Sequence, residues 1–420
     1  MINTRTIKRM AASGAAAIAF ICAAAPAQAQ LHINLVDQGG VTGSASEQGF
    51  KIAAAYWESV LTNNVTVNLG VRYAALGTGI IGSTSSPKFG VAIQDVEDAM
   101  IATGNSALDA GLVRPALTGT GNVGAPFGTV GTIDMIRNGP QGTGKLSNTK
   151  IYDTNDTKDN GTVSGTRANL LALGYVLPTA TVDASVTFST AFNFDFDPTD
   201  GISAGYMDFI GVAIHEIGHA LGFTSGVDTY DAYGPLGPNG SVTTINWDIN
   251  TVGNILDLFR YSNDPTNLVA GSGAVLDWSY NTASYFSIDG GATQFDDGSL
   301  FSTGAYNGDG RQASHFKDTA SGAGGCNGYN QIGIMDPTFC YGEMGVISGT
   351  DLAAFDAIGW NINFDVLGNK KYTINTDQIF RNVTGVPEPM TWGTMLLGFG
   401  LVGGFMRRRR DQKSGALLAA

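Results

Sequence analysis

Residues 209–223 read Phe-Ile-Gly-Val-Ala-Ile-His-Glu-Ile-Gly-His-Ala-Leu-Gly-Phe and place His215, Glu216 and His219 within an otherwise apolar run. Side chains four residues apart share one face of an α-helix, so this spacing points both imidazoles the same way. Two imidazoles on one face can reach a single zinc ion, and a neighbouring carboxylate can take a proton from water. The stretch therefore predicts a helix with His215 and His219 as metal ligands and Glu216 as general base.

The alternative is an apolar helix that carries two histidines without a metal. The whole sequence has four histidines, and two of them fall in this one turn. An unpaired imidazole is costly to bury in apolar surroundings, which favours the metal interpretation. A catalytic zinc also needs a third protein ligand and an open fourth position.

Gly222 follows His219 by three residues, where a glycine suits the end of the helix. The resulting His-Glu-x-x-His-x-x-Gly pattern resembles the metzincin peptidases. Their next ligand would fall at Ser225, a residue type that does not suit zinc. Farther along, Ala-Ser-His315-Phe-Lys precedes Gly-Ile-Met335-Asp-Pro. This order resembles the leishmanolysin group of metzincins, in which a long insertion separates the helix from a third histidine and a Met-turn follows.

The resemblance covers residues 209–360, and residues 350–360 are similar to the closing helix of that group. It implies His315 as the third zinc ligand and Met335 as the methionine of the Met-turn. Asp228 is the alternative third ligand, although imidazole is the more usual choice. The implied fold is α+β, a metzincin-like zinc peptidase of two subdomains. A twisted mixed sheet carries the active-site helix, and an irregular C-terminal subdomain follows a β-rich insertion.

Apolar spacing predicts further elements: a helix over 48–61, a strand over 65–73, a helix over 94–103, glycine-rich loops over 104–160 and a strand over 184–196. The resemblance implies that this last strand borders the cleft and pairs with an extended substrate. The expected segments are a signal peptide (1–29), an N-terminal catalytic subdomain with the zinc helix (30–225), a β-rich insertion (226–314), a C-terminal subdomain with the third ligand and the Met-turn (315–385), and a sorting tail (386–420).

Both ends of the sequence read as sorting signals. Residues 1–29 combine an early positive charge, an apolar run and Ala-Gln-Ala, which is typical of a cleaved secretory signal rather than a membrane span. Residues 387–410 place Pro-Glu-Pro before an apolar run and four arginines. This order resembles the PEP-CTERM signal that an exosortase removes in Gram-negative bacteria, and a simple membrane anchor is the alternative. His32 would then lie at the mature terminus, where we expect it to be solvated.

The charge balance fits export. The formal net charge is −13, although both predicted signals are positive, so the body between them is more acidic still. That balance argues against a nucleic-acid partner. We expect a protein that is extracellular or at the surface of a Gram-negative bacterium and meets the membrane only transiently, through its sorting tail.

Two further groups of residues suggest supporting sites. Asp195, Asp197 and Asp200 fall in one turn before the zinc helix, and their oxygens suit Ca²⁺; the alternative is a solvated acidic turn near a helix N-terminus. Cys326 and Cys340 remain after signal removal. An even count in an exported chain predicts one disulfide, with zinc ligation as the alternative.

The function that follows is an exported zinc metalloendopeptidase acting on a protein or peptide substrate. Water activated by Zn²⁺ would attack the peptide bond, with Glu216 as its base. The competing hypothesis is a non-catalytic, zinc-containing surface or extracellular-matrix protein that its PEP-CTERM tail sorts. An intact Glu216 favours the peptidase, because a purely structural zinc site has no use for a base there.

Overall fold

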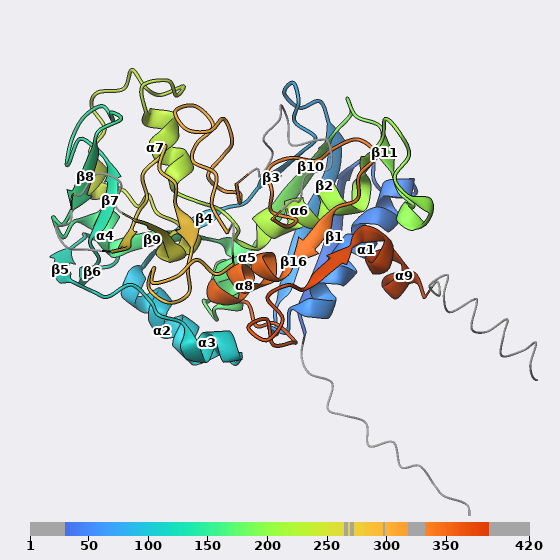
Figure 1. The fold of residues 1–420 in the computed structure, drawn as a ribbon, viewed down its shortest axis with the longest axis horizontal. Coiled ribbons are helices and arrows are strands. Elements are labelled where there is room, and N and C mark those ends of the chain that lie inside the picture. Colours follow the sequence, from blue (N-terminus) through green and yellow to red (C-terminus); the bar gives the residue numbers. More distant parts are fainter. Residues whose placement is uncertain (1–29, 264–267, 269–272, 297–298, 318–331, 386–420) are drawn as a thin grey trace, which may run out of the picture.

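The computed structural model describes residues 30–263, 268, 273–296, 299–317 and 332–385. The predicted signal peptide and sorting tail lie outside these ranges and stay predictions. The described chain has a mixed α+β fold, and Figure 1 shows its elements in two groups that lie side by side. Helix α6, which contains the His-Glu-x-x-His motif, lies in the group that contains the largest sheet.

That sheet has four strands in the order β1–β2–β10–β3. Strands β1 (His32–Gly39), β2 (Thr66–Ala74) and β10 (Ala184–Ser189) run parallel, and β3 (Gly82–Ser85) runs antiparallel to β10. The predicted strand over 65–73 is confirmed by β2. The sheet is therefore mixed, in line with the α+β fold that the resemblance implies.

The predicted strand over 184–196 needs two corrections. Strand β10 ends at Ser189, and a turn separates it from the short strand β11 (Phe194–Asp195), which pairs with β12 (Met207–Asp208). Strand β10 also lies inside the sheet, because β2 and β3 occupy its two edges. A strand paired on both sides has no free backbone groups for a substrate, so the expected strand addition at β10 is wrong. The edge on that side of the sheet is β3.

Two helices pack together against this sheet. Helix α1 (Ala45–Val60) contacts β1 and α6 (Phe209–Leu221), and α6 contacts β3 and β10. The prediction of a helix over 48–61 is confirmed by α1. The rings of Phe50, Phe188 and Phe209 meet where α1, β10 and α6 join, with centroids 4.5–5.1 Å apart. Each buried Phe contributes roughly 1.5–3 kcal/mol, so this cluster fixes the start of α6 on the sheet.

The second group begins with residues 88–172. Its elements are β4 (Lys88–Ala92), α2 (Ile93–Thr103), α3 (Ala107–Gly111), β5 (Gly119–Asn122), β6 (Thr129–Thr132), β7 (Met135–Asn138), β8 (Lys150–Asp153), α4 (Lys158–Gly161), β9 (Thr162–Thr166) and α5 (Arg167–Ala172). The predicted second helix is confirmed by α2.

The expectation of loops over 104–160 is wrong, because β5–β6 and β7–β8 form hairpins there. Arg137 of β7 and Asp153 of β8 form a fully buried ion pair, so this hairpin lacks the apolar alternation that predicts strands.

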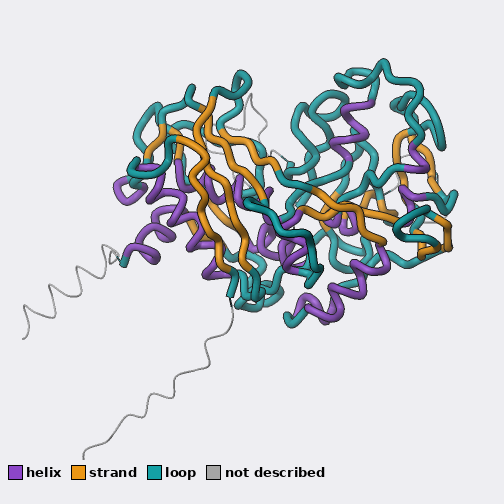
Figure 2. Tube along the Cα trace, turned by 180° about the vertical axis from the view of Figure 1, so that it is seen from behind, coloured by secondary structure: helices purple, strands orange, loops and turns teal. Residues whose placement is uncertain are grey.

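The described residues between 226 and 317 pack against the second group. They contain α7 (Val227–Tyr233) and the short strands β13 (Arg260–Ser262), β14 (Val275–Leu276) and β15 (Tyr285–Phe286), which form one antiparallel sheet. Backbone bridges join them to the preceding segment, for example Ser164 with Asn254 and Ile136 with Asp277. Much of this part is loop, as Figure 2 shows from behind.

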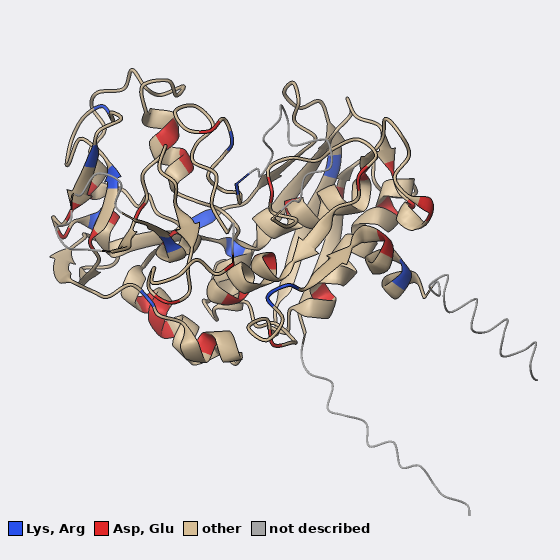
Figure 3. Cartoon of the chain, in the orientation of Figure 1, with Lys and Arg blue, Asp and Glu red and all other residues tan. Residues whose placement is uncertain are grey.

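Residues 332–385 then return to the first group, although the helix over 349–357 also contacts α3 of the second group. Strands β16 (Val346–Ser348) and β17 (Thr373–Asn375) pair, α8 (Gly349–Ala357) follows β16, and α9 (Thr376–Thr384) packs on α1. Helix α8 confirms the helix predicted near 350–360. Acidic residues are spread over both groups in Figure 3, and the sequence has 36 of them against 23 lysines and arginines. In the described ranges no helix is both long and apolar enough to cross a membrane.

Candidate metal centre

Helix α6 is held at both ends and along its buried side. The Asp208 carboxylate accepts the backbone N–H of Gly211 at 3.0 Å and caps the first turn. Gly222 ends the helix at φ 123°, a conformation that strains other residues. The indole N–H of Trp57 donates to the Ile214 carbonyl, and that of Trp360 donates to the Leu221 carbonyl. These contacts fix the rotation of the helix, and with it the direction of its two histidines.

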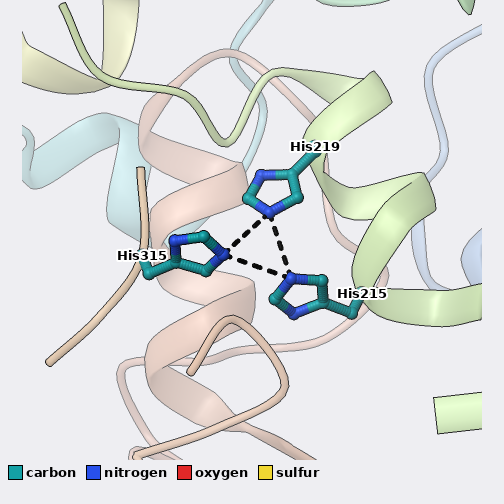
Figure 4. A group of neighbouring side chains, drawn as sticks. All are labelled: His215, His219 and His315. Atoms are coloured by element: carbon teal, nitrogen blue, oxygen red, sulfur yellow. Dashed lines mark hydrogen bonds between the residues drawn. The ribbon is translucent and has the colours of Figure 1, made fainter. Parts of the chain in front are cut away.

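The structure brings His215, His219 and His315 together. Their Nε2 atoms lie 3.1 Å (His215–His219), 3.1 Å (His219–His315) and 3.3 Å (His215–His315) apart. Figure 4 shows the three rings pointing toward a common centre, with His315 reaching it from a separate loop. In the described part of the chain, these histidines are the only set of three or more ligand-type side chains close enough to share a metal ion.

The opposite nitrogen of each ring contacts a backbone carbonyl. His215 Nδ1 lies 2.7 Å from the Ile334 oxygen, His219 Nδ1 lies 2.7 Å from the Phe223 oxygen, and His315 Nδ1 lies 3.1 Å from the Gln312 oxygen. A carbonyl oxygen only accepts, so each Nδ1 must carry a proton and donate it. In a neutral ring, Nε2 is then left with a bare lone pair.

Burial keeps these rings neutral. It lowers the pKa of His215 to about 4, lowers the pKa of His219 to about 3 together with the neighbouring His215, and holds the pKa of His315 well below its ordinary value. Neutral rings with protonated Nδ1 atoms cannot hydrogen-bond to one another through Nε2. Three lone pairs therefore face each other at 3.1–3.3 Å, and such an arrangement is repulsive unless a cation lies between them.

The spacing and the donor type both fit zinc. Ligands at about 2.0–2.1 Å in tetrahedral geometry lie about 3.3 Å from each other, close to the three distances here. Carbonyl partners on the far ring nitrogens are also the usual support for zinc-bound histidines, because they fix the tautomer and the ring orientation. The three residues thus match a site with three nitrogen ligands and one remaining position.

Glu216 lies beside this cluster, with 5% of its surface exposed. The Thr84 hydroxyl of β3 lies 2.7 Å from Glu216 Oε2 and 2.8 Å from the Glu216 backbone carbonyl oxygen, and it can donate its proton to either acceptor. Burial raises the pKa of Glu216 to about 7, and the Thr84 hydrogen bond opposes that rise. A carboxyl group with a pKa near neutrality can both accept and release a proton, as a general base must.

Strand β3 also brings Gly82 against Glu216. A Cβ atom at position 82 would lie 2.6 Å from Glu216 Oε1, so only a glycine leaves the carboxylate where it is. The sequence analysis did not identify Gly82 or Thr84 as part of the site. The stretch Gly82-Ser83-Thr84-Ser85 shows no apolar alternation, and nothing in it relates position 84 to position 216.

Met335 lies beneath α6. It is fully buried, and a Cβ atom on Gly218 would lie 2.6 Å from its sulfur. Its carbonyl accepts the backbone N–H of Phe316 at 2.9 Å, which links it to the loop of His315. Met335 therefore contacts the helical turn between His215 and His219. Its backbone also hydrogen-bonds to the residue that follows the third histidine.

Asp228, the alternative third ligand, is not in the cluster of ligand atoms. Its carboxylate accepts hydrogen bonds from Ala313 and Ser314, the residues just before His315. The geometry therefore favours His315 over Asp228 as the third donor.

The other predicted residues do not join this centre. Asp195 accepts the backbone N–H groups of Asp197 and Ser203, Asp197 accepts that of Thr199, and the structure does not gather them with Asp200 as one set of ligands. The calcium site stays an untested prediction.

The two remaining predictions are the disulfide between Cys326 and Cys340 and the solvated position of His32. Cys340 is buried, but Cys326 lies outside the described residues, so their disulfide also stays a prediction. His32 is exposed and contacts Glu58, away from the cluster.

Comparison of the chain with protein-family models, with curated proteins and with solved structures finds no match. A function can therefore be inferred only from the geometry of the three imidazoles and from Glu216.

Proposed function

We propose that this protein is an exported zinc-dependent endopeptidase, similar to the metzincins and in particular to the leishmanolysin group. The observation that carries the proposal is the meeting of three unprotonated Nε2 atoms at a helix that also carries the buried carboxylate of Glu216, next to His215 in the chain. Three neutral imidazoles would leave the ion strongly Lewis acidic. A nearby base with a pKa close to neutrality is what hydrolysis at such a site needs.

The roles of the chain's own residues follow from their contacts. His215, His219 and His315 would hold zinc through Nε2, and the bound ion would supply Lewis acidity to water and to the scissile carbonyl. Glu216 would take a proton from water on its carboxylate and release it to the leaving amine. Thr84 keeps that carboxylate oriented through its hydroxyl.

The edge of the sheet suggests where a peptide would lie. In the described part of the chain, β3 pairs with β10 on one side and with no strand on the other. Its residues Gly82 and Thr84 also contact Glu216. A substrate that adds to β3 as an extended strand would therefore pass directly beside the base, with main-chain hydrogen bonds holding it in place.

The test is Glu216→Gln in the exported protein, with a casein digestion assay and a measurement of zinc content. Gln has nearly the same shape but cannot act as a base. The variant should keep zinc and lose about 10²–10⁴-fold or more of the wild-type turnover. The matched control is Glu97→Gln on α2, because burial also raises the pKa of Glu97 to about 7, although it is not among the clustered ligands. This control should remain active.

The same assay separates the proposal from a non-catalytic zinc protein. Wild-type protein that holds zinc tightly but cleaves neither casein nor an unbiased peptide library supports the structural alternative. Full activity in Glu216→Gln would remove Glu216 from its role and require a different base.

A further inference from the structure

We infer that Asp228 is a positioning residue that sets the distance between His315 and the zinc helix. The inference rests on the proposed zinc site. It concerns a carboxylate that touches none of the three imidazoles and acts through the backbone of the residues before the third one.

The Asp228 carboxylate accepts hydrogen bonds from the loop residues immediately before His315. Its Oδ1 accepts the backbone N–H of Ala313 at 2.6 Å. Its Oδ2 accepts the backbone N–H of Ser314 at 3.2 Å and the Ser314 hydroxyl. Hydrogen bonds to a charged acceptor are about twice as strong as neutral ones, so this carboxylate is a strong polar anchor of the loop.

The chain of contacts continues to the other ligand-bearing segment. The Ser314 hydroxyl oxygen accepts the backbone N–H of Ser225 at 2.8 Å. Ser225 lies three residues beyond Gly222, where the zinc helix ends. Asp228 and Ser314 therefore join the loop of His315 to the chain that leaves the helix of His219. A change in this link would shift one imidazole relative to the others.

Helix α7 also offers a matched comparison. Asp231, one turn after Asp228, is a buried carboxylate that accepts the backbone N–H groups of Tyr306 at 2.8 Å and Asn307 at 2.7 Å. It anchors the same long loop at a point several residues away from His315. Loss of charge at Asp231 should lower stability as much as loss at Asp228, but it should not move the imidazole.

The experiment compares three forms of the exported protein: the wild type, the Asp228→Asn variant and the Asp231→Asn variant. Asn keeps the shape of Asp but offers one acceptor oxygen in place of two, so one of the bonds to Ala313 or Ser314 is lost. Zinc affinity is measured by competition with a chromophoric chelator, and ligand geometry by the visible spectrum of the Co²⁺-loaded protein. Residues that orient metal ligands typically affect affinity about 10–100-fold, and we expect a loss in that range for Asp228→Asn.

The Co²⁺ spectrum of Asp228→Asn should change shape, and both affinity and spectrum of Asp231→Asn should match wild type. Unchanged affinity and spectrum in Asp228→Asn would overturn the inference. An equal loss in Asp231→Asn would overturn it too, because the role would then be general to the loop. If Asp228→Asn does not fold, Ser314→Ala decides the question with the same two readouts, since it breaks the link to Ser225.

These readouts keep the inference separate from peptidase activity. A wild-type protein that binds zinc but cleaves nothing refutes the proposed function and leaves the affinity comparison to decide the role of Asp228. A wild-type protein that does not bind zinc overturns both.

Discussion

Replacing Gly82 by Ala tests the placement of Glu216 most directly. The added Cβ would lie 2.6 Å from Glu216 Oε1 and 2.9 Å from its Cγ, which is inside van der Waals contact by more than half an ångström. Gly82 does not have a positive φ, so the β3 backbone itself accepts Ala. The side chain of Glu216 must move, and a displacement of about 1 Å at a reacting group costs on the order of 10²-fold in rate.

The assay for Gly82→Ala combines kcat/KM on a peptide substrate, zinc content and thermal unfolding. We expect a loss of activity of about 10²-fold with wild-type zinc content. Stability should fall by about 1–3 kcal/mol, because overpacking beside a buried side chain outweighs the small gain of Ala over Gly in a strand. Gly111→Ala in α3 is the control, because a Cβ there meets nothing within 4 Å. Wild-type kcat/KM in Gly82→Ala would show that Glu216 does not work from this position.

Three further predictions concern other parts of the molecule. His315→Ala should abolish both stoichiometric zinc and activity while the circular dichroism spectrum stays native; full zinc retention in this variant would exclude His315 as a ligand. Burial raises the pKa of Asp356 in α8 to about 8 from 3.8. The folded chain then holds a proton that the unfolded chain releases, so stability falls from about pH 4 toward pH 8, by up to about 1.4 kcal/mol per pH unit. Asp356→Asn should flatten that slope in urea unfolding, and an unchanged slope would contradict the assignment. Mass spectrometry of the exported protein should show a chain that lacks residues 1–29 and the tail beyond Pro-Glu-Pro, with Cys326 bridged to Cys340; an intact arginine cluster would support a membrane anchor.

The helix and its two histidines could be predicted because the signal is local. The spacing of His215 and His219 fixes a shared face within one turn, whatever surrounds the helix. The third histidine was reached through resemblance, since nothing local relates His315 to a helix that ends almost a hundred residues earlier. The structure supplies that relation through the carbonyls of Ile334, Phe223 and Gln312, which orient each ring from a different segment.

The errors in the fold have two physical causes. Strand β3 consists of Gly, Ser and Thr, so no apolar pattern marked it, and the place of β10 inside the sheet depends on that unmarked neighbour. The hairpin β7–β8 was read as loop because Arg137 and Asp153 look like surface residues in a sequence. In the folded chain they are a buried ion pair, and only the pairing makes their burial tolerable.

The surroundings of Glu216 bear on whether the proposed zinc site is catalytic or structural. A buried carboxylate is costly unless hydrogen bonds or a cation compensate it. Thr84 supplies one hydrogen bond, and burial raises the pKa of Glu216 in spite of it. A structural site gains nothing from a buried carboxyl group beside its ligands, because burying that group costs free energy. The presence of that carboxylate next to three neutral donors therefore favours a site in which its proton affinity is used.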